Sequence, residues 1–522
     1  MKKQLLVLMI GMMGVKGYGQ INFQKAYGGN SDDIGEFVQQ TFDGGYILVG
    51  ETYPIGGGNV YLIKTNAYGD TLWTRAFGEN SGAYGTCVRQ TFDGGYIIAG
   101  RIPDDANYTG YVYLIKTNSG GDTLWTKELG EGGASSIQQT TDGGYIIGGS
   151  TSCDMCTDRL LLIKTDNLGD TLWSRIFDAE DNDGGASVQQ TIDGGYIIAG
   201  SCQNLGNPGF THVYIIKTDS NGDTLWTKTY GDSALVGYDY GASIQQTNDG
   251  GYIIVGGTNF GAGNRNVYLI KINSIGDLLW SIAYGGARNN YGNSVQQTID
   301  GGFIIAGSTS SFSDTLSDVY LIKTNSVGDT LWTRTYGGSN YDYATSVHQT
   351  FDGGYIIAGY TSSFGAGGND LYLIKTDSNG NVGCNEGRTS TIISFPPTQV
   401  IPETTFVRSG FLNHLEPTLV LNGGTVTTIC SDEGINEVAS KNSISLYPNP
   451  TSGTFTLSIR NYELGIRNGE LSIFDVLGQV VYTQPIINQE STIINLPQLS
   501  NGVYFYQLSN SKETLRGKFV KN

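Results

Sequence analysis

Short apolar segments alternate with tight turns in seven copies of one pattern between residues 36 and 384. One copy contains residues 294–298, a turn, residues 303–307, a variable loop, residues 318–324, a second turn and residues 328–337. The segments are rich in Val, Ile, Tyr and Thr and bounded by turn residues, which is typical of β-strands. None has a sustained 3.6-residue apolar period, so we expect no helix in this region.

Each copy also carries an Asp-Gly-Gly turn between its first two segments, where glycine supplies the positive φ angles of a tight hairpin. The turn aspartates recur about every 50 residues, a period typical of propellers and solenoids. They are Asp43, Asp93, Asp142, Asp193, Asp249, Asp300 and Asp352. Four antiparallel strands in such a period predict the blade of a β-propeller.

The seventh copy stops at Cys384 without a fourth segment, and the missing strand is found at the other end of the chain. Residues 21–29 align with residues 331–338 if Phe23 takes the place of Trp332. A last blade shared between the chain ends closes a ring without an exposed sheet edge. The sequence therefore predicts an all-β fold, a closed seven-bladed propeller of four-stranded blades over residues 20–384.

Two repeated residue types fit structural roles within the blade. The six tryptophans share one position in the fourth segment, and we interpret them as anchors that pack one blade against the next. They are Trp73, Trp125, Trp173, Trp226, Trp280 and Trp332. The repeated lysines are interpreted as solvated strand positions; they are Lys64, Lys116, Lys164, Lys217, Lys271, Lys323 and Lys375.

The Gly-Asp-Thr-Leu-Trp stretch resembles the strand-ending motif of quinoprotein propellers and, more loosely, the Asp-box hairpin of sialidases, while the repeat period resembles that of kelch propellers. These resemblances cover about ten residues of each blade. In those families the motifs are mainly structural, so the resemblance implies a fold and no activity.

The C-terminal residues 443–522 have a different pattern, in which alternating strands and Asn-Gly, Leu-Gly and Pro turns predict a small β-sandwich. They open with Tyr-Pro-Asn-Pro-x-x-Gly, continue through Asp-x-Leu-Gly-Gln and Asn-Gly-Val-Tyr, and end with Lys518, Phe519, Val520 and Lys521. This combination resembles the C-terminal sorting domain of the type IX (Por) secretion system of Bacteroidetes bacteria. The resemblance implies a sorting signal, the secretion machinery as a partner, and a secreted or outer-membrane-attached protein.

The start of the chain reads as a secretory signal peptide over residues 1–19, with Lys2 and Lys3 before an apolar core that is too short for a membrane span. Residues 385–442 remain as a β-rich appendage and polar linker. No transmembrane segment is predicted. The net charge of −18 argues against nucleic acid as a partner, and we expect a monomeric propeller.

The six cysteines fit an oxidising compartment. Cys384 and Cys430 flank the appendage, and we predict a disulfide between them. Cys153 and Cys156 lie in one loop, where a disulfide or two free thiols are both open, and Cys202 is an alternative partner for either. Cys87 lies in an inner strand, where we expect it to be buried.

No catalytic motif, cofactor site or metal-ligand spacing occurs among the residues. The hairpin turns on one face of the disc offer little beyond repeated Asp-Gly-Gly, whereas the variable loops emerge on the other face, where binding usually lies. Tyr84, Tyr240, Tyr291 and Tyr343 stand just before the first segment and are candidates for a ring at the channel mouth. The alternative is that they pack beneath loops.

Arg89 and His348 replace a glutamine at the first-segment position that the other five copies keep, and they are the remaining candidate binding residues. Two classes of function stay open. The first is a secreted or surface binding module for a glycan or protein, with no catalysis. The second is a polysaccharide hydrolase or lyase with an acidic site or an Arg89–His348 site.

Overall fold

The computed structural model describes residues 21–53, 57–78, 82–104, 109–151, 159–178, 184–203, 210–232, 238–261, 263–313, 316–402, 406–408, 413–414, 420–421, 425–431, 443–447, 454–460, 468–474, 480–487, 491–496, 498–500, 502–509 and 514–521. These residues form strands and turns, and no helix occurs among them. The chain divides into two compact units, with the boundary between Asp432 and Glu433.

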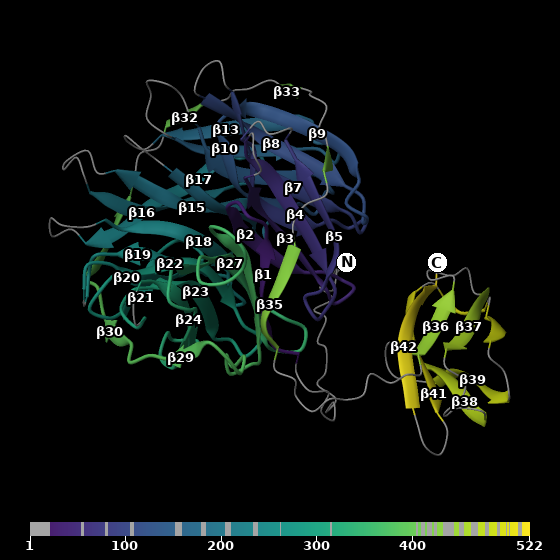
Figure 1. Cartoon of the computed structure of the whole chain (residues 1–522). Helices are drawn as coiled ribbons and strands as arrows, with labels where there is room; N and C mark the ends of the chain where they lie inside the picture. The colour runs from purple at the N-terminus through teal and green to yellow at the C-terminus, as the bar shows by residue number, and fades with distance from the viewer. Residues whose placement is uncertain are drawn as a thin grey trace. The chain divides into compact units, whose positions relative to one another are not determined.

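In the described part of the first unit, seven antiparallel sheets repeat one strand order (Figure 1). Sheets 1 to 6 each take four consecutive strands from one sequence repeat. Sheet 1 holds β2 (Asp33–Gln40), β3 (Tyr46–Thr52), β4 (Asn59–Thr65) and β5 (Thr71–Phe77). Sheet 2 holds β6 (Tyr84–Gln90), β7 (Tyr96–Asp104), β8 (Thr109–Thr117) and β9 (Thr123–Glu131). Sheet 3 holds β10 (Gly133–Gln139), β11 (Tyr145–Ser150), β12 (Leu160–Thr165) and β13 (Thr171–Asp178).

The next three sheets follow the same order. Sheet 4 holds β14 (Gly184–Gln190), β15 (Tyr196–Gln203), β16 (Thr211–Thr218) and β17 (Thr224–Asp232); sheet 5 holds β18 (Tyr240–Gln246), β19 (Tyr252–Thr258), β20 (Asn266–Ile272) and β21 (Leu278–Gly285); sheet 6 holds β22 (Asn290–Gln297), β23 (Phe303–Thr309), β24 (Asp318–Thr324) and β25 (Thr330–Tyr336). The first glycine of every Asp-Gly-Gly turn has φ between 81° and 88°, the region that favours glycine.

Sheet 7 joins the two ends of the repeat region. It contains β26 (Asp342–Gln349), β27 (Tyr355–Thr361) and β28 (Asp370–Thr376), followed by β1 (Phe23–Gly28) from the N-terminal end. Phe23 lies opposite Lys375 in the same register that places Trp73 opposite Lys64. The N-terminal strand therefore supplies the segment that the seventh repeat lacks, as the sequence predicted.

Aromatic pairs hold each sheet against the next one. The tryptophan of the fourth strand meets an aromatic ring of the following sheet edge to face, as in the pair Trp73–Tyr96, and this confirms its predicted packing role. The same contact recurs at all six tryptophans, and Phe23 repeats it with Tyr46 between sheets 7 and 1. Ring centroids are 5.8 to 6.4 Å apart in these seven pairs.

A second set of contacts links the sheets through glutamines at the end of the inner strands. The Gln90 side-chain oxygen accepts a hydrogen bond from the Phe42 backbone N–H of sheet 1 at 2.8 Å. The equivalent bonds follow through sheets 2 to 7. The last bond runs from Phe351 N–H of sheet 7 to Gln40 of sheet 1 at 2.8 Å. Sheet 7 thus contacts sheet 1 in the way that the other sheets contact their neighbours.

The repeated lysines correct the sequence interpretation, because they are buried and at most 4% exposed. Each Nζ lies 2.8 to 3.0 Å from a carboxylate oxygen of the Asp-Gly-Gly aspartate in its own sheet, as in Lys64–Asp43. The Lys64 Nζ also donates to the Thr65 backbone oxygen at 2.8 Å. A charge at a buried position is tolerated when it is paired and hydrogen-bonded in this way.

A fifth strand lies on the outer edge of every sheet, which the four-stranded prediction missed. These strands come from residues 385–431, here called the belt. In chain order they are β29 (Glu386–Arg388) on sheet 6, β30 (Ile392–Ser394) on sheet 5, β31 (Thr398–Pro402) on sheet 4, β32 (Phe406–Arg408) on sheet 3, β33 (Asn413–His414) on sheet 2, β34 (Val420–Leu421) on sheet 1 and β35 (Thr425–Ser431) on sheet 7 (Figure 1). The belt therefore visits the sheets in the reverse of their chain order.

One disulfide joins the last strand of the belt to the residue that precedes the belt. The structure contains a disulfide between Cys384 and Cys430, with their Cα atoms 6.4 Å apart. Along the belt, Thr391 and Thr398 hydrogen bond to the hydroxyls of Tyr320 and Tyr268 in sheets 6 and 5. An edge strand exposes unpaired N–H and C=O groups, so the belt covers the edge that each of the seven sheets would otherwise present.

The second unit contains two sheets in its described residues. One holds β36 (Ser443–Tyr447), β37 (Thr454–Arg460) and β40 (Ser491–Asn495), and the other holds β39 (Val480–Ile487), β38 (Asn468–Phe474), β41 (Gly502–Ser509) and β42 (Thr514–Lys521). Leu471 and Leu508 of the second sheet share one buried core with Ile494 of the first. Lys518, Phe519, Val520 and Lys521 lie in β42, which pairs with β41.

Candidate binding channel

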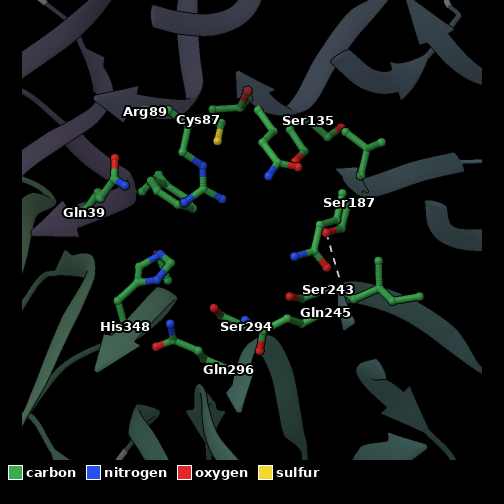
Figure 2. Close-up of a pocket in the computed structure, with 18 of the residues that line it drawn as sticks. Gln39, Cys87, Arg89, Ser135, Ser187, Ser243, Gln245, Ser294, Gln296 and His348 are labelled. Atoms are coloured by element: carbon green, nitrogen blue, oxygen red, sulfur yellow. Dashed lines mark hydrogen bonds between the residues drawn. The ribbon is translucent and has the colours of Figure 1, made fainter. Parts of the chain in front are cut away.

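A cavity of about 620 Å³ lies between the seven inner strands, and residues of β2, β6, β10, β14, β18, β22 and β26 line it (Figure 2). The first segments of the seven repeats therefore line one cavity, here called the channel. The register shifts once in each inner strand, for example between Gly35 and Phe37, and this bulge turns Glu36 toward the cavity. Bulges are often found where a strand directs a side chain into a site.

The channel wall consists of stacked rings of equivalent residues. One ring holds five serines, here called the channel serines: Ser136, Ser187, Ser243, Ser294 and Ser346. Four of them accept a hydrogen bond from a backbone N–H of the next sheet, at distances between 3.1 and 3.5 Å. Phe37 and Cys87 take the remaining two positions of this ring, and Cys87 is buried as expected.

A further ring holds five channel glutamines: Gln39, Gln138, Gln189, Gln245 and Gln296. The side-chain oxygen of each accepts a hydrogen bond from the backbone N–H of the second glutamine in the next sheet, at 2.6 to 2.8 Å. Arg89 and His348 take the remaining two positions, and no such bond is formed to them among the described residues. The structure therefore places both predicted residues in the channel wall, where they interrupt one ring.

Arg89 and His348 lie on either side of Phe37. The Arg89 guanidinium stands 4.3 Å from the Phe37 ring centroid, and the His348 ring lies 5.1 Å from it, edge to face. The Nε of Arg89 donates to the Ile137 carbonyl at 3.3 Å. Burial, with the Arg89 charge adding to it, lowers the pKa of His348 to about 3, so this imidazole is neutral at neutral pH. Phe37 thus joins the two predicted residues into one cluster that the sequence did not indicate.

Glu36 is a channel residue that sequence reasoning missed. Burial raises the pKa of its carboxyl to about 8, and the Glu51 carboxylate nearby adds to this shift. The first repeat has a glutamate at the position where the next two repeats have Thr86 and Ser135, and this departure could have indicated Glu36 from the sequence. At pH 7 the Glu36 side chain is mostly an uncharged acid, so it can donate a hydrogen bond and adds little negative charge to the channel.

The four predicted tyrosines begin their inner strands and are partly buried, but none is among the residues that line the cavity. The Arg265 guanidinium lies 5.6 Å from the Tyr291 ring centroid. Burial raises the pKa of Tyr240 to about 12, although the positive charge of Arg265 acts to lower this pKa. Tyr343 stacks on Tyr341 at 6.0 Å between ring centroids.

Tyr360 completes that second group, because its ring centroid lies 5.0 Å from that of Tyr343. Tyr341 is 45% exposed, so the stack reaches solvent. Tyr341 and Tyr360 were not predicted, although Tyr341 stands two residues before Tyr343 in the sequence. The tyrosines thus form small aromatic groups on the face of the variable loops.

The face of the hairpin turns also differs from expectation, because it displays apolar side chains. The residue before the Asp of the Asp-Gly-Gly turn is Phe42, Phe92, Ile192, Ile299 or Phe351 in five sheets, between 61% and 78% exposed. Exposed apolar positions of this kind mark interaction surfaces when they form a contiguous patch. The sequence interpretation considered the repeated turn and overlooked the variable residue within it.

Other predicted sites have simpler outcomes. Cys202 is buried, and Cys153 and Cys156 lie outside the described residues, so the pairing of these three stays a prediction. Within the described ranges, no group of three or more His, Cys, Asp or Glu side chains could hold a metal ion. No helix in the described part of the chain is long and apolar enough to cross a membrane.

Comparison with known proteins places the second unit in a class. Residues 445–522 match the family described as the secretion system C-terminal sorting domain. This match agrees with the resemblance seen in the sequence to the type IX sorting domain, and it implies export to the cell surface or secretion, with handling by that secretion machinery. No curated protein matches the chain.

Two solved structures show weak likeness to the chain. Sqt1 from Chaetomium thermophilum has 12% sequence identity and a TM-score of 0.40, with 65% of this chain and 82% of that chain covered. The extracellular domain of a hybrid two-component system from B. thetaiotaomicron has 11% identity and a TM-score of 0.14, with 92% and 77% covered. At these scores neither structure informs the fold or function of this protein.

Proposed function

We propose that the first unit is a closed seven-bladed β-propeller that acts as a binding module for a glycan or protein at the cell surface or outside the cell. The contacts between sheets 7 and 1 support closure, since they repeat the aromatic and glutamine contacts of the other sheets. The sorting-domain match supports export through a type IX system, with residues 1–19 as the signal peptide and Lys518–Lys521 as part of the sorting signal.

The binding role rests on the combination of a polar channel with aromatic groups on the variable-loop face. A cavity of about 620 Å³ falls within the range of small-ligand sites, roughly 300–1,000 Å³. Tyrosines such as Tyr341 and Tyr343 offer flat apolar faces with polar hydroxyls, which suits stacking on sugars or contact with peptides.

A glycan and protein array probed with the purified full-length protein tests this function. Any specific ligand is then titrated against the triple variant Tyr240→Ala, Tyr291→Ala, Tyr343→Ala. We expect binding to weaken at least tenfold, since each stacking contact is worth about 0.5–1.5 kcal/mol. Unchanged affinity with an unchanged melting temperature would exclude this face and redirect the search to the apolar hairpin face.

A polysaccharide hydrolase is the second candidate, and the pair Glu36 and Glu51 favours it. A raised pKa, as at Glu36, is typical of the general acid of a glycosidase, whose partner carboxylate stays ionised; burial raises the pKa of Glu51 as well. Against this role, Glu36 lines the cavity and Glu51 does not. If the array yields a polysaccharide ligand, its incubation with the protein over hours should release product, and Glu36→Gln should abolish the release; intact polysaccharide would leave only the binding role.

A further inference from the structure

The side-chain oxygens of the channel glutamines each accept a hydrogen bond, which leaves their amide NH₂ groups available as donors. A backbone N–H can only donate, so the bond from Gln90 N–H fixes the side-chain oxygen of Gln39 toward sheet 2. The amide NH₂ group must then point elsewhere. The same reasoning applies to all five channel glutamines, whose NH₂ groups have no protein partner among the described residues. In Figure 2 the amide nitrogen of Gln296 lies on the side of the open centre.

The channel serines add to this excess of donors. The hydroxyl oxygen of Ser294 accepts the Val347 N–H at 3.1 Å, and three further channel serines accept in the same way. An oxygen that accepts from one side still has its own O–H to donate. The same contacts that join neighbouring sheets therefore orient donors of two chemical types toward the cavity.

Arg89 supplies the charge of this wall. Its guanidinium extends into the open centre in Figure 2, stacked on Phe37, and it forms no ion pair within the described residues. The Glu36 carboxyl and the His348 imidazole in the same wall are both mostly uncharged at neutral pH. A chain with a net charge of −18 thus keeps one cation without an ion pair, among the described residues, in a cavity that also presents amide and hydroxyl donors.

Building on the proposed glycan-binding function, we propose that the channel binds the carboxylate or sulfate group of an acidic sugar. Oxyanions accept several hydrogen bonds at once, and an arginine donor strengthens such binding through its charge. The negative net charge disfavours a densely charged polymer, so a single acidic residue at the end or side of a glycan fits this site best.

Calorimetric titration of the full-length protein with matched sugars tests the proposal. Glucuronic acid and glucose differ only in the carboxylate, and glucose 6-sulfate provides the sulfate arm. We expect the two acidic sugars to bind at least about tenfold more tightly than glucose, in line with the greater strength of charge-assisted hydrogen bonds. The proposal is overturned if glucose and both acidic sugars bind equally well. It is also overturned if N-acetyl-aspartate binds more tightly than the acidic sugars, because this would indicate a protein carboxylate as the ligand.

The chain offers a matched pair of variants for this assay. Arg89→Gln installs the residue that five other sheets carry, and it gives the Gln139 N–H an acceptor, so we expect the fold to be kept. It removes the channel charge and should reduce glucuronate binding at least tenfold without changing glucose binding. Arg388→Gln removes an equal charge from an exposed residue of the belt on the outer edge of sheet 6, and it should bind glucuronate within about twofold of the parent.

Equal losses in both variants, or no loss in Arg89→Gln, would refute the assigned role of Arg89. Melting temperatures of the two variants show whether each one is folded. The array distinguishes the two proposals. A neutral glycan or a protein as ligand supports the proposed binding function and contradicts the acidic-sugar site.

Discussion

Opening the disulfide between Cys384 and Cys430 should loosen the belt and lower the stability of the first unit. The perturbation is the double variant Cys384→Ser, Cys430→Ser, which removes the cross-link and replaces one residue of β35, Cys430. The two cysteines are 46 residues apart. The loop-closure entropy that a cross-link of this span removes from the unfolded chain corresponds to about 4 kcal/mol at 25 °C.

The structure also predicts where the loss appears first. Five of the seven belt strands are two or three residues long, as in β33 (Asn413–His414) and β34 (Val420–Leu421), so few hydrogen bonds hold each one. Without the disulfide the belt should detach strand by strand before the sheets unfold. Limited proteolysis followed by mass spectrometry should then find the first cuts within residues 385–431.

Urea unfolding measures the magnitude, and a reducing agent provides the matched control. Reduction of the parent protein should reproduce the loss of about 4 kcal/mol, whereas it should not destabilise the double variant further. If the variant unfolds at the parent's urea concentration and its belt resists protease equally well, the belt is held by its strand contacts alone and the reasoning from loop closure is wrong.

Three further outcomes follow from the structure. Deleting residues 20–29 removes β1 and the Phe23–Tyr46 contact, so size-exclusion chromatography and thermal melting should show aggregation or a much lower melting temperature; a normal melt would sink the closed ring. Removing residues 518–522 should trap the protein in the periplasm of its native host, as cell fractionation would show, and normal surface delivery would contradict the sorting role. Folding raises the pKa of Glu36 from 4.5 to about 8, so its contribution to stability is present below pH 4.5 and lost as pH rises through 8. The variant Glu36→Gln should flatten this part of the stability–pH curve, and a curve identical to the parent's would refute the shift.

The repeat carried enough information to predict the strands and their order, but not how polar side chains are satisfied. The register of Phe23 could be predicted because one aromatic ring replaces another at a fixed position. The burial of Lys64 could not, because its partner Asp43 is 21 residues away and meets it only when the sheet is formed. A lysine between apolar residues looks the same in sequence whether it is solvated or paired.

The belt and the channel cluster were missed for a related reason. Strands such as β33 are too short to give an alternating pattern, and they exist because the outer edge of a sheet is available to pair with them. Phe37 and His348 lie more than 300 residues apart and meet only where the chain ends share a boundary between sheets 1 and 7. Arg89 and His348 were found because each departs from its repeat, and departures within a repeat are visible without any structure.

The two glutamine rings differ in how freely they can change during evolution by repeat duplication. The outer ring, from Gln40 to Gln349, is complete in all seven copies, and each member holds the turn of the preceding sheet. The inner ring has Arg89 and His348 at two positions, and the hydrogen bond that the five glutamines accept from the next sheet is absent there among the described residues. Single substitutions in the inner ring should therefore leave the contacts of the outer ring in place, and under the proposed binding function they would change the ligand without dismantling the sheets.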